Sequence, residues 1–137
     1  MSTCFSWPVR VYYEDTDAGG VVFYANYLKF MERARTEWLR HLGYEQDALA
    51  ERDGVLFVVR RTEVDYRYPA RFNDLLDVTV EVVKKGGASL SFRQEVRRHS
   101  DGRVCCSGTV DAACVGAETF RPSRIPSHLL AEIADVV

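Results

Sequence analysis

The sequence predicts an α+β fold in which a curved, five-stranded antiparallel sheet wraps around one long central helix. Three observations lead to this prediction: an early Val- and Tyr-rich segment, one long stretch with helical periodicity, and four later stretches with a period of two. The chain has 137 residues, 47% of them hydrophobic, which is enough to bury one core. We find no internal repeat and no Pro-, Gly- or Ser-rich linker, so we expect a single domain over residues 1–137.

The N-terminal half predicts one strand, one loop and the helices. Residues 8–13 are rich in Val and Tyr and indicate a first strand, and the adjacent glycines Gly19 and Gly20 then indicate a loop. From about residue 24 to 42 the apolar side chains recur at spacings of three and four, which predicts the long helix. Asn26 is a candidate cap at its start and Gly43 a candidate stop, and residues 46–52 predict a shorter helix.

After Gly54 the period changes to two, which is typical of strands with one buried face. Alternation over residues 62–68, 76–82 and 90–96 predicts three strands, and the turn Ser100-Asp101-Gly102 leads to a last strand over residues 104–115. Residues 127–137 predict a short terminal helix. We expect hairpin-like connections among these strands and one sheet that covers the apolar side of the long helix.

Composition excludes several classes of protein. With 18 basic and 20 acidic residues, the chain has no strong field of one sign, so nucleic acid is not an expected partner. The four cysteines form no CxxC pair and no histidine completes a zinc site, which predicts a reduced, metal-free protein. The N-terminal segment lacks the apolar core of a signal peptide and the long helix carries charges throughout. We therefore expect a cytoplasmic protein without a membrane span.

The segment YEDTDAGGVVFYANY at residues 13–27, continued by ERAR at residues 32–35, resembles the 4-hydroxybenzoyl-CoA thioesterase family. Within that family the chain is most similar to the YbgC-like, Tol-Pal-associated acyl-CoA thioesterases, over about residues 7–126. The resemblance implies a hotdog fold, dimers that pair into tetramers, and hydrolysis of acyl-CoA without metal or organic cofactor. It also implies that Asp17 is the catalytic carboxylate and that the backbone N–H of Tyr24 polarises the thioester carbonyl.

The chemistry of the segment supports this transfer. Asp17 lies at the edge of a glycine-containing loop, seven residues before Tyr24, where the helix is expected to open with free N–H groups. Such groups, at the positive end of the helix dipole, are suited to the oxyanion that forms when a thioester is attacked. Asp17 would either add to the carbonyl to form a mixed anhydride or act as general base on water. The alternative is that Asp17 only caps a turn, and Asp15 is then the second candidate.

Other residues are assigned with less specific support. Many YbgC-like members have His where this chain has Tyr24, so activity should survive the difference if the backbone N–H is used. Gly19 and Asn26 are grouped with the substrate-binding residues, although Asn26 would equally orient the loop or cap the helix. Tyr27 and Trp38 are expected in the core.

The hairpin at residues 84–89 is a candidate site for the CoA moiety. Lys84 and Lys85 would meet the CoA phosphates, as basic residues near this hairpin do in the resembling family, and Ser89 would line the pantetheine path. A solvated hairpin end is the alternative. Arginines at positions 60, 61, 67 and 71 are further phosphate candidates, and the three histidines, His41, His99 and His128, are expected to be exposed.

Two rival functions remain. A hydratase or dehydratase on the same fold usually needs a His paired with a carboxylate, and no His lies in or beside the motif. A non-catalytic module that binds acyl-CoA or acyl-carrier protein is the second rival. Because a single sheet-and-helix unit leaves its helix start and edge strand open, we expect the active site at an interface between two copies, in a homodimer or homotetramer.

Overall fold

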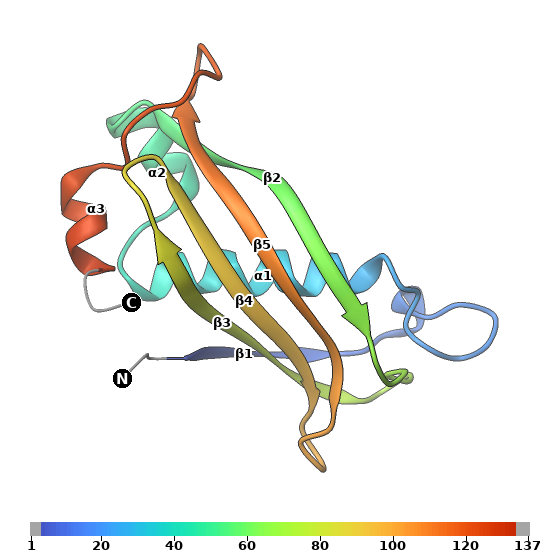
Figure 1. Cartoon of the computed structure of the whole chain (residues 1–137). Coiled ribbons are helices and arrows are strands. Elements are labelled where there is room, and N and C mark those ends of the chain that lie inside the picture. The colour runs from blue at the N-terminus through green and yellow to red at the C-terminus, as the bar shows by residue number, and fades with distance from the viewer. Residues whose placement is uncertain (1–3, 134–137) are drawn as a thin grey trace.

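The computed structural model describes residues 4–133 and confirms the α+β hotdog architecture. All strand pairs are antiparallel and the order across the sheet is β1-β3-β4-β5-β2. The long helix α1 lies across one face of the curved sheet, with α2 and α3 near one end of it (Figure 1). The elements are β1 (Phe5–Arg10), a 3₁₀ turn (Tyr13–Asp15), α1 (Asn26–His41), α2 (Gln46–Arg52), β2 (Val55–Tyr66), β3 (Leu75–Lys85), β4 (Ser89–Arg98), β5 (Val104–Gly116) and α3 (Ser127–Glu132).

Two predictions about the strands are wrong. The first strand lies earlier than residues 8–13, because the chain leaves β3 after Arg10 and turns at Tyr13, where the Asp15 carboxylate accepts the Tyr12 N–H at 2.8 Å. The connection from β2 to β3 is not a hairpin, since β4 and β5 lie between these two strands in the sheet. Among the strands of residues 4–133, only β3 with β4 and β4 with β5 are both consecutive in the chain and neighbours in the sheet. The prediction for residues 134–137 lies outside the described residues.

The core fills the space between α1 and the inner face of the sheet. The buried face of the helix presents Tyr27, Phe30, Met31, Ala34 and Leu39 to alternate residues of the strands. Trp38 is half-buried and packs edge-on against Phe92, with ring centroids 5.3 Å apart, so the core predictions for Tyr27 and Trp38 are confirmed. None of the helices in residues 4–133 is both long and apolar enough to cross a membrane.

Two local features agree with the sequence. Gly43 follows the helix with φ of 95°, in the left-handed region that glycine adopts without steric cost, and its N–H donates to the Arg40 carbonyl at 2.8 Å. Cys105, Cys106 and Cys114 are buried free thiols. Burial raises the pKa of Cys106 to about 12, so this thiol stays protonated and packs as a small apolar side chain.

Candidate active site

The loop that carries Asp17 is a tight, self-bonded turn. The N–H of Asp17 donates to the Val21 carbonyl at 2.9 Å, and the N–H of Gly20 donates to the Asp17 carbonyl at 3.0 Å. Gly20 has φ of 78°, which favours glycine at this position. The Asp17 Oδ1 atom accepts the Gly19 N–H at 2.8 Å, so the carboxylate is oriented by its own loop. Gly19 therefore lies against the carboxylate, and a Cβ there would stand 3.2 Å from Oδ1.

Asp15, the second candidate for the catalytic acid, is buried at the base of this loop. Its side chain is 8% exposed, and its carboxylate accepts the Tyr12 N–H. Its backbone carbonyl accepts two hydrogen bonds of 2.9 Å, one from the Phe23 N–H and one from the Asn26 Nδ2 group. Asn26 is the first residue of α1, and the residue before it, Ala25, occupies the N-cap position without a side-chain hydrogen bond. The cap interpretation of Asn26 is wrong, whereas its alternative role as a loop tether is confirmed.

The start of α1 presents an unused backbone donor. The Asn26 N–H donates to the Phe23 carbonyl and the Leu28 N–H to the Ala25 carbonyl, whereas the Tyr24 N–H finds no acceptor within residues 4–133. The Tyr24 side chain is 62% exposed and contacts the rings of Phe23 and Tyr66. This N–H, in the turn that opens the helix, is the donor expected from the sequence.

Tyr27 fixes the position of the helix start against the segment before β3. It is buried, and its hydroxyl accepts the Ala70 N–H at 3.0 Å, while the Ala70 carbonyl accepts the Val22 N–H at 2.8 Å. Burial raises the pKa of Tyr27 to about 12. Helix, loop and residue 70 are therefore held together, which gives the Asp17 loop a rigid base.

A single chain does not enclose Asp17. The side chain is exposed, and the cavity of about 240 Å³ at the helix start is lined by Tyr24, Tyr27 and Tyr66 but not by Asp17. Aromatic side chains are also exposed around it, with Tyr13 stacked on Phe72 at a centroid distance of 3.9 Å. The Asp17 loop and Tyr24 thus lie at the end of the molecule where α1 begins (Figure 1).

The basic hairpin residues separate into two places. Lys84 and Ser89 line one groove on the outer face of the sheet, together with Arg60 and Arg61. Lys85 instead donates from Nζ to the Ile133 carbonyl at 3.3 Å and so contacts the end of α3. The sheet therefore brings together four of the polar groups expected near CoA and turns Lys85 away from them.

Most of the chain matches a known protein family. Residues 11–133 match the model of the thioesterase-like superfamily. The chain is 46% identical to the acyl-CoA thioester hydrolase YbgC of Escherichia coli O157:H7, over 96% of each protein. It is also 46% identical to the acyl-CoA thioesterase YbgC of Haemophilus influenzae, over 93% of this chain and 92% of that protein. The chain belongs to the thioesterase-like superfamily.

Solved structures of this superfamily superpose on the chain. A probable thioesterase from Bartonella henselae has a TM-score of 0.85 and 32% sequence identity, and the match covers 90% of this chain and all of that one. Within the superfamily, the chain is YbgC-like, as the motif at residues 13–27 indicates. The resemblance identified from the sequence is therefore confirmed at the level of the family.

The three histidines of this thioesterase-like chain lie away from the Asp17 loop. His41, His99 and His128 are all exposed, as predicted: His99 meets Asp77 at 2.8 Å, and His128 lies between Tyr44 and Asp53.

Sequence reasoning missed Arg35, whose guanidinium donates to the buried Gln94. The only sequence signal for this pair was a polar residue among the inward-facing positions of a strand, at Gln94.

Proposed function

We propose that this chain hydrolyses acyl-CoA thioesters, with Asp17 as the catalytic carboxylate and the Tyr24 N–H as oxyanion donor. Acyl-CoA hydrolysis is the activity named for the YbgC relatives that match nearly the whole chain. The observation that carries the assignment of residues is that a carboxylate oriented by Gly19 and a backbone N–H without an acceptor in residues 4–133 share the open end of α1. One such donor is worth about 3 kcal/mol in the transition state of acyl transfer.

Two reaction routes use these groups. In the first, a carboxylate oxygen of Asp17 adds to the thioester carbon, the C–S bond breaks, and water then hydrolyses the mixed anhydride to free acid and Asp17. In the second, Asp17 takes a proton from water as the water oxygen adds to the carbon, and the proton passes to the departing sulfur. In both, the carbonyl oxygen becomes negative next to the Tyr24 N–H. Repeated turnover in H₂¹⁸O tests the first route, because only that route can place the label in the Asp17 carboxylate, when water attacks the Asp17 carbon of the anhydride.

A second copy of the chain would complete the site. Asp17 and Tyr24 are exposed, and β2 is an edge strand with unpaired backbone groups on its outer side. A homodimer, or a homotetramer of such dimers, would cover both and exclude water from the thioester. Light scattering of the purified protein tests this, and a monomer with full activity would contradict it.

The thiol-bearing part of the substrate would extend over the sheet. The groove contains Lys84, Ser89, Arg60 and Arg61, together with one acid, Asp111, so it has the excess positive charge and the hydroxyl that CoA phosphates and pantetheine need. Acyl-carrier protein would present the same pantetheine arm without the nucleotide. Both substrates belong to the cytoplasm, where we place the enzyme. Activity on acyl-CoA and acyl-carrier protein, compared in one assay, decides which thiol is preferred.

The direct test is release of free thiol from a panel of acyl-CoAs. We expect turnover without added metal or organic cofactor. Binding of acyl-CoA without any thiol release would favour the rival reading of a non-catalytic binding module. A hydratase is disfavoured because none of the three histidines lies near the Asp17 loop.

A further inference from the structure

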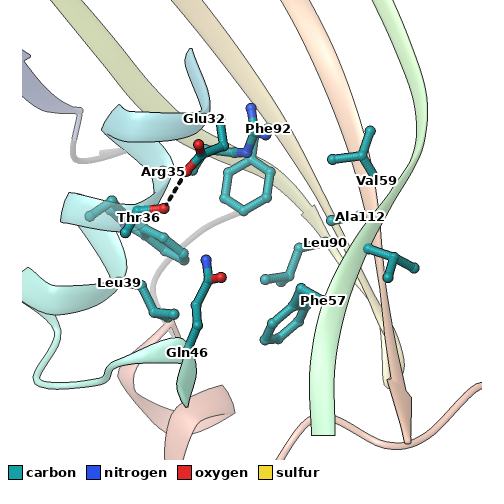
Figure 2. Close-up of a pocket in the computed structure, with 12 residues that line it drawn as sticks. Glu32, Arg35, Thr36, Leu39, Gln46, Phe57, Val59, Leu90, Phe92 and Ala112 are labelled. Carbon is teal, nitrogen blue, oxygen red and sulfur yellow. Dashed lines mark hydrogen bonds between the residues drawn. The ribbon is translucent and has the colours of Figure 1, made fainter. Parts of the chain in front are cut away.

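A cavity of about 170 Å³ lies beside the second half of α1, away from the Asp17 loop (Figure 2). Helix α1 packs against β1, β3 and β4, so room is left between the helix and the strands at the β2 edge. In Figure 2, Glu32, Arg35 and Thr36 border the cavity from the helix, opposite Phe57 and Val59 of β2. Apolar side chains form most of its wall: Trp38, Leu39, Phe57, Val59, Leu90 and Phe92.

The buried side-chain amide of Gln94 fixes the position of Arg35 in this wall. Gln94 is 0% exposed, and its Nε2 donates to the carbonyls of Met31 at 3.0 Å and Thr79 at 3.2 Å. The amide oxygen must therefore face the helix, where it accepts from Arg35 Nη1 at 2.8 Å. A fully satisfied buried amide is a rigid support, so the guanidinium is held at the cavity.

The charge of Arg35 is not neutralised by an ion pair. Arg35 is half-buried and has no carboxylate within 4.0 Å in residues 4–133. The neighbouring acid, Glu32, uses its Oε2 atom to accept the Thr36 hydroxyl at 2.7 Å. Burial lowers the pKa of Arg35, and the charge of nearby Glu32 acts in the opposite direction. A guanidinium remains charged in proteins, and four of its five N–H donors have no partner within residues 4–133.

One side of α1 connects this arginine with the helix start. Leu28, Glu32 and Arg35 follow one another at spacings of four and three and so share a helix face, and Leu28 is 41% exposed. From Asn26 to Arg35 the helix rises roughly 13 Å. An acyl chain of medium length that begins at the Tyr24 N–H and passes Leu28 would therefore bring its far end to Arg35.

We infer that Arg35 selects acyl chains that end in a carboxylate, with the methylene groups lying between α1 and the β2 edge. The inference rests on the proposed function, since it assumes that the thioester lies at the helix start. A terminal carboxylate would accept charge-assisted hydrogen bonds from the free guanidinium N–H groups. Glu32 opposes this binding by like charge, so it limits the preference that Arg35 creates.

The test compares two substrates that differ only at the chain end: decanoyl-CoA and sebacoyl-CoA, its ω-carboxy counterpart. We expect the wild-type kcat/KM to be about tenfold or more higher for sebacoyl-CoA. Arg35→Met should abolish this ratio. Arg33→Met is the matched control, because Arg33 is exposed on the same helix with its guanidinium over the Phe30 ring, and the ratio should survive there. A ratio that is unchanged in Arg35→Met would overturn the inference.

Two further variants test the inference even if Arg35→Met fails to fold. Glu32→Gln should raise the sebacoyl preference, because it removes the opposing charge. Arg35→Lys keeps a charge but loses the planar fork, so it should retain only part of the ratio. If the wild type cleaves decanoyl-CoA without any preference for sebacoyl-CoA, the selectivity is refuted and the proposed function stands. If it cleaves neither, nor any other acyl-CoA, the proposed function fails and the inference falls with it.

Discussion

The Nδ2 group of Asn26 donates a 2.9 Å hydrogen bond to the backbone carbonyl of Asp15 and so joins the first turn of α1 to the base of the Asp17 loop. The same carbonyl accepts the Phe23 N–H, which leaves the next N–H, that of Tyr24, free to bind an oxyanion. The two proposed catalytic groups are thus positioned by one buried junction.

Asn26→Ala should weaken both stability and catalysis. The variant leaves part of a buried carbonyl unsatisfied, so the free energy of unfolding should fall by about 1–2 kcal/mol, measured by urea denaturation. We expect kcat to fall more than KM rises, because the loop is repositioned while the CoA groove is untouched. Asn26→Asp should be worse than Asn26→Ala, since it places an acceptor against a carbonyl. Equal kcat in wild type and Asn26→Ala would argue against a positioning role.

Asp17→Asn should lower kcat by at least about a hundredfold, because an amide can neither attack the thioester nor accept the proton of water. The Gly19 N–H retains an oxygen acceptor in this variant, so the melting temperature and the oligomeric state should not change. Glu14→Gln, a neighbouring exposed acid, is the control and should keep full activity. Near-normal hydrolysis by Asp17→Asn would reject the assignment.

The adjacent glycines should separate activity from stability. A Cβ at Gly19 stands 3.2 Å from Asp17 Oδ1, so Gly19→Ala should displace the carboxylate and reduce kcat. A Cβ at Gly20 meets open space, but φ of 78° costs an alanine roughly 1–2 kcal/mol. Gly20→Ala should therefore lower the melting temperature more than Gly19→Ala does. The reverse order in kcat and stability would contradict this account of the loop.

Tyr24→Ala and Tyr24→His should keep kcat within about threefold of wild type, because the backbone N–H is retained in both. Tyr24→Pro removes that N–H and should reduce kcat by about a hundredfold or more. Circular dichroism must show intact folding for the proline variant to count. A large loss in Tyr24→Ala with full activity in Tyr24→Pro would place the effect in the side chain instead.

Tyr27 should make stability fall in alkaline solution. Its pKa is about 12 in the folded chain against 10.0 for the ordinary phenol, so above pH 10 the unfolded chain loses this proton first. The unfolded state then binds fewer protons, and the free energy of unfolding decreases from pH 10 to about pH 12. Tyr27→Phe removes the acceptor of the Ala70 N–H and should cost about 1–3 kcal/mol at neutral pH, with a shallower alkaline decline. Denaturation curves at several pH values test both effects.

The parts predicted well from the sequence are those encoded by short spacings. The helical period of residues 24–42, the stop at Gly43 and the period of two after Gly54 each involve neighbours within a few residues, and all agree with the structure. The first strand lies earlier in the chain than predicted, because a local turn around Asp15 competes with strand propensity at residues 11–13. The Asp15 carboxylate stabilises this turn by accepting the Tyr12 N–H. The prediction of a hairpin between β2 and β3 was wrong because strand order depends on pairings between residues far apart in the chain.

The sequence by itself predicted the fold class from its periodicities, and the contiguous motif at residues 13–27 was enough to reveal the resemblance to the family. Only the tertiary structure decided which side chains meet across the core: Arg35 and Gln94 are 59 positions apart, and Asn26 and Asp15 join through a carbonyl that no pattern of side chains reveals. The physical reason is that a cavity and its buried hydrogen bonds arise from packing between distant elements, whereas a turn or a helix arises from the backbone preferences of consecutive residues.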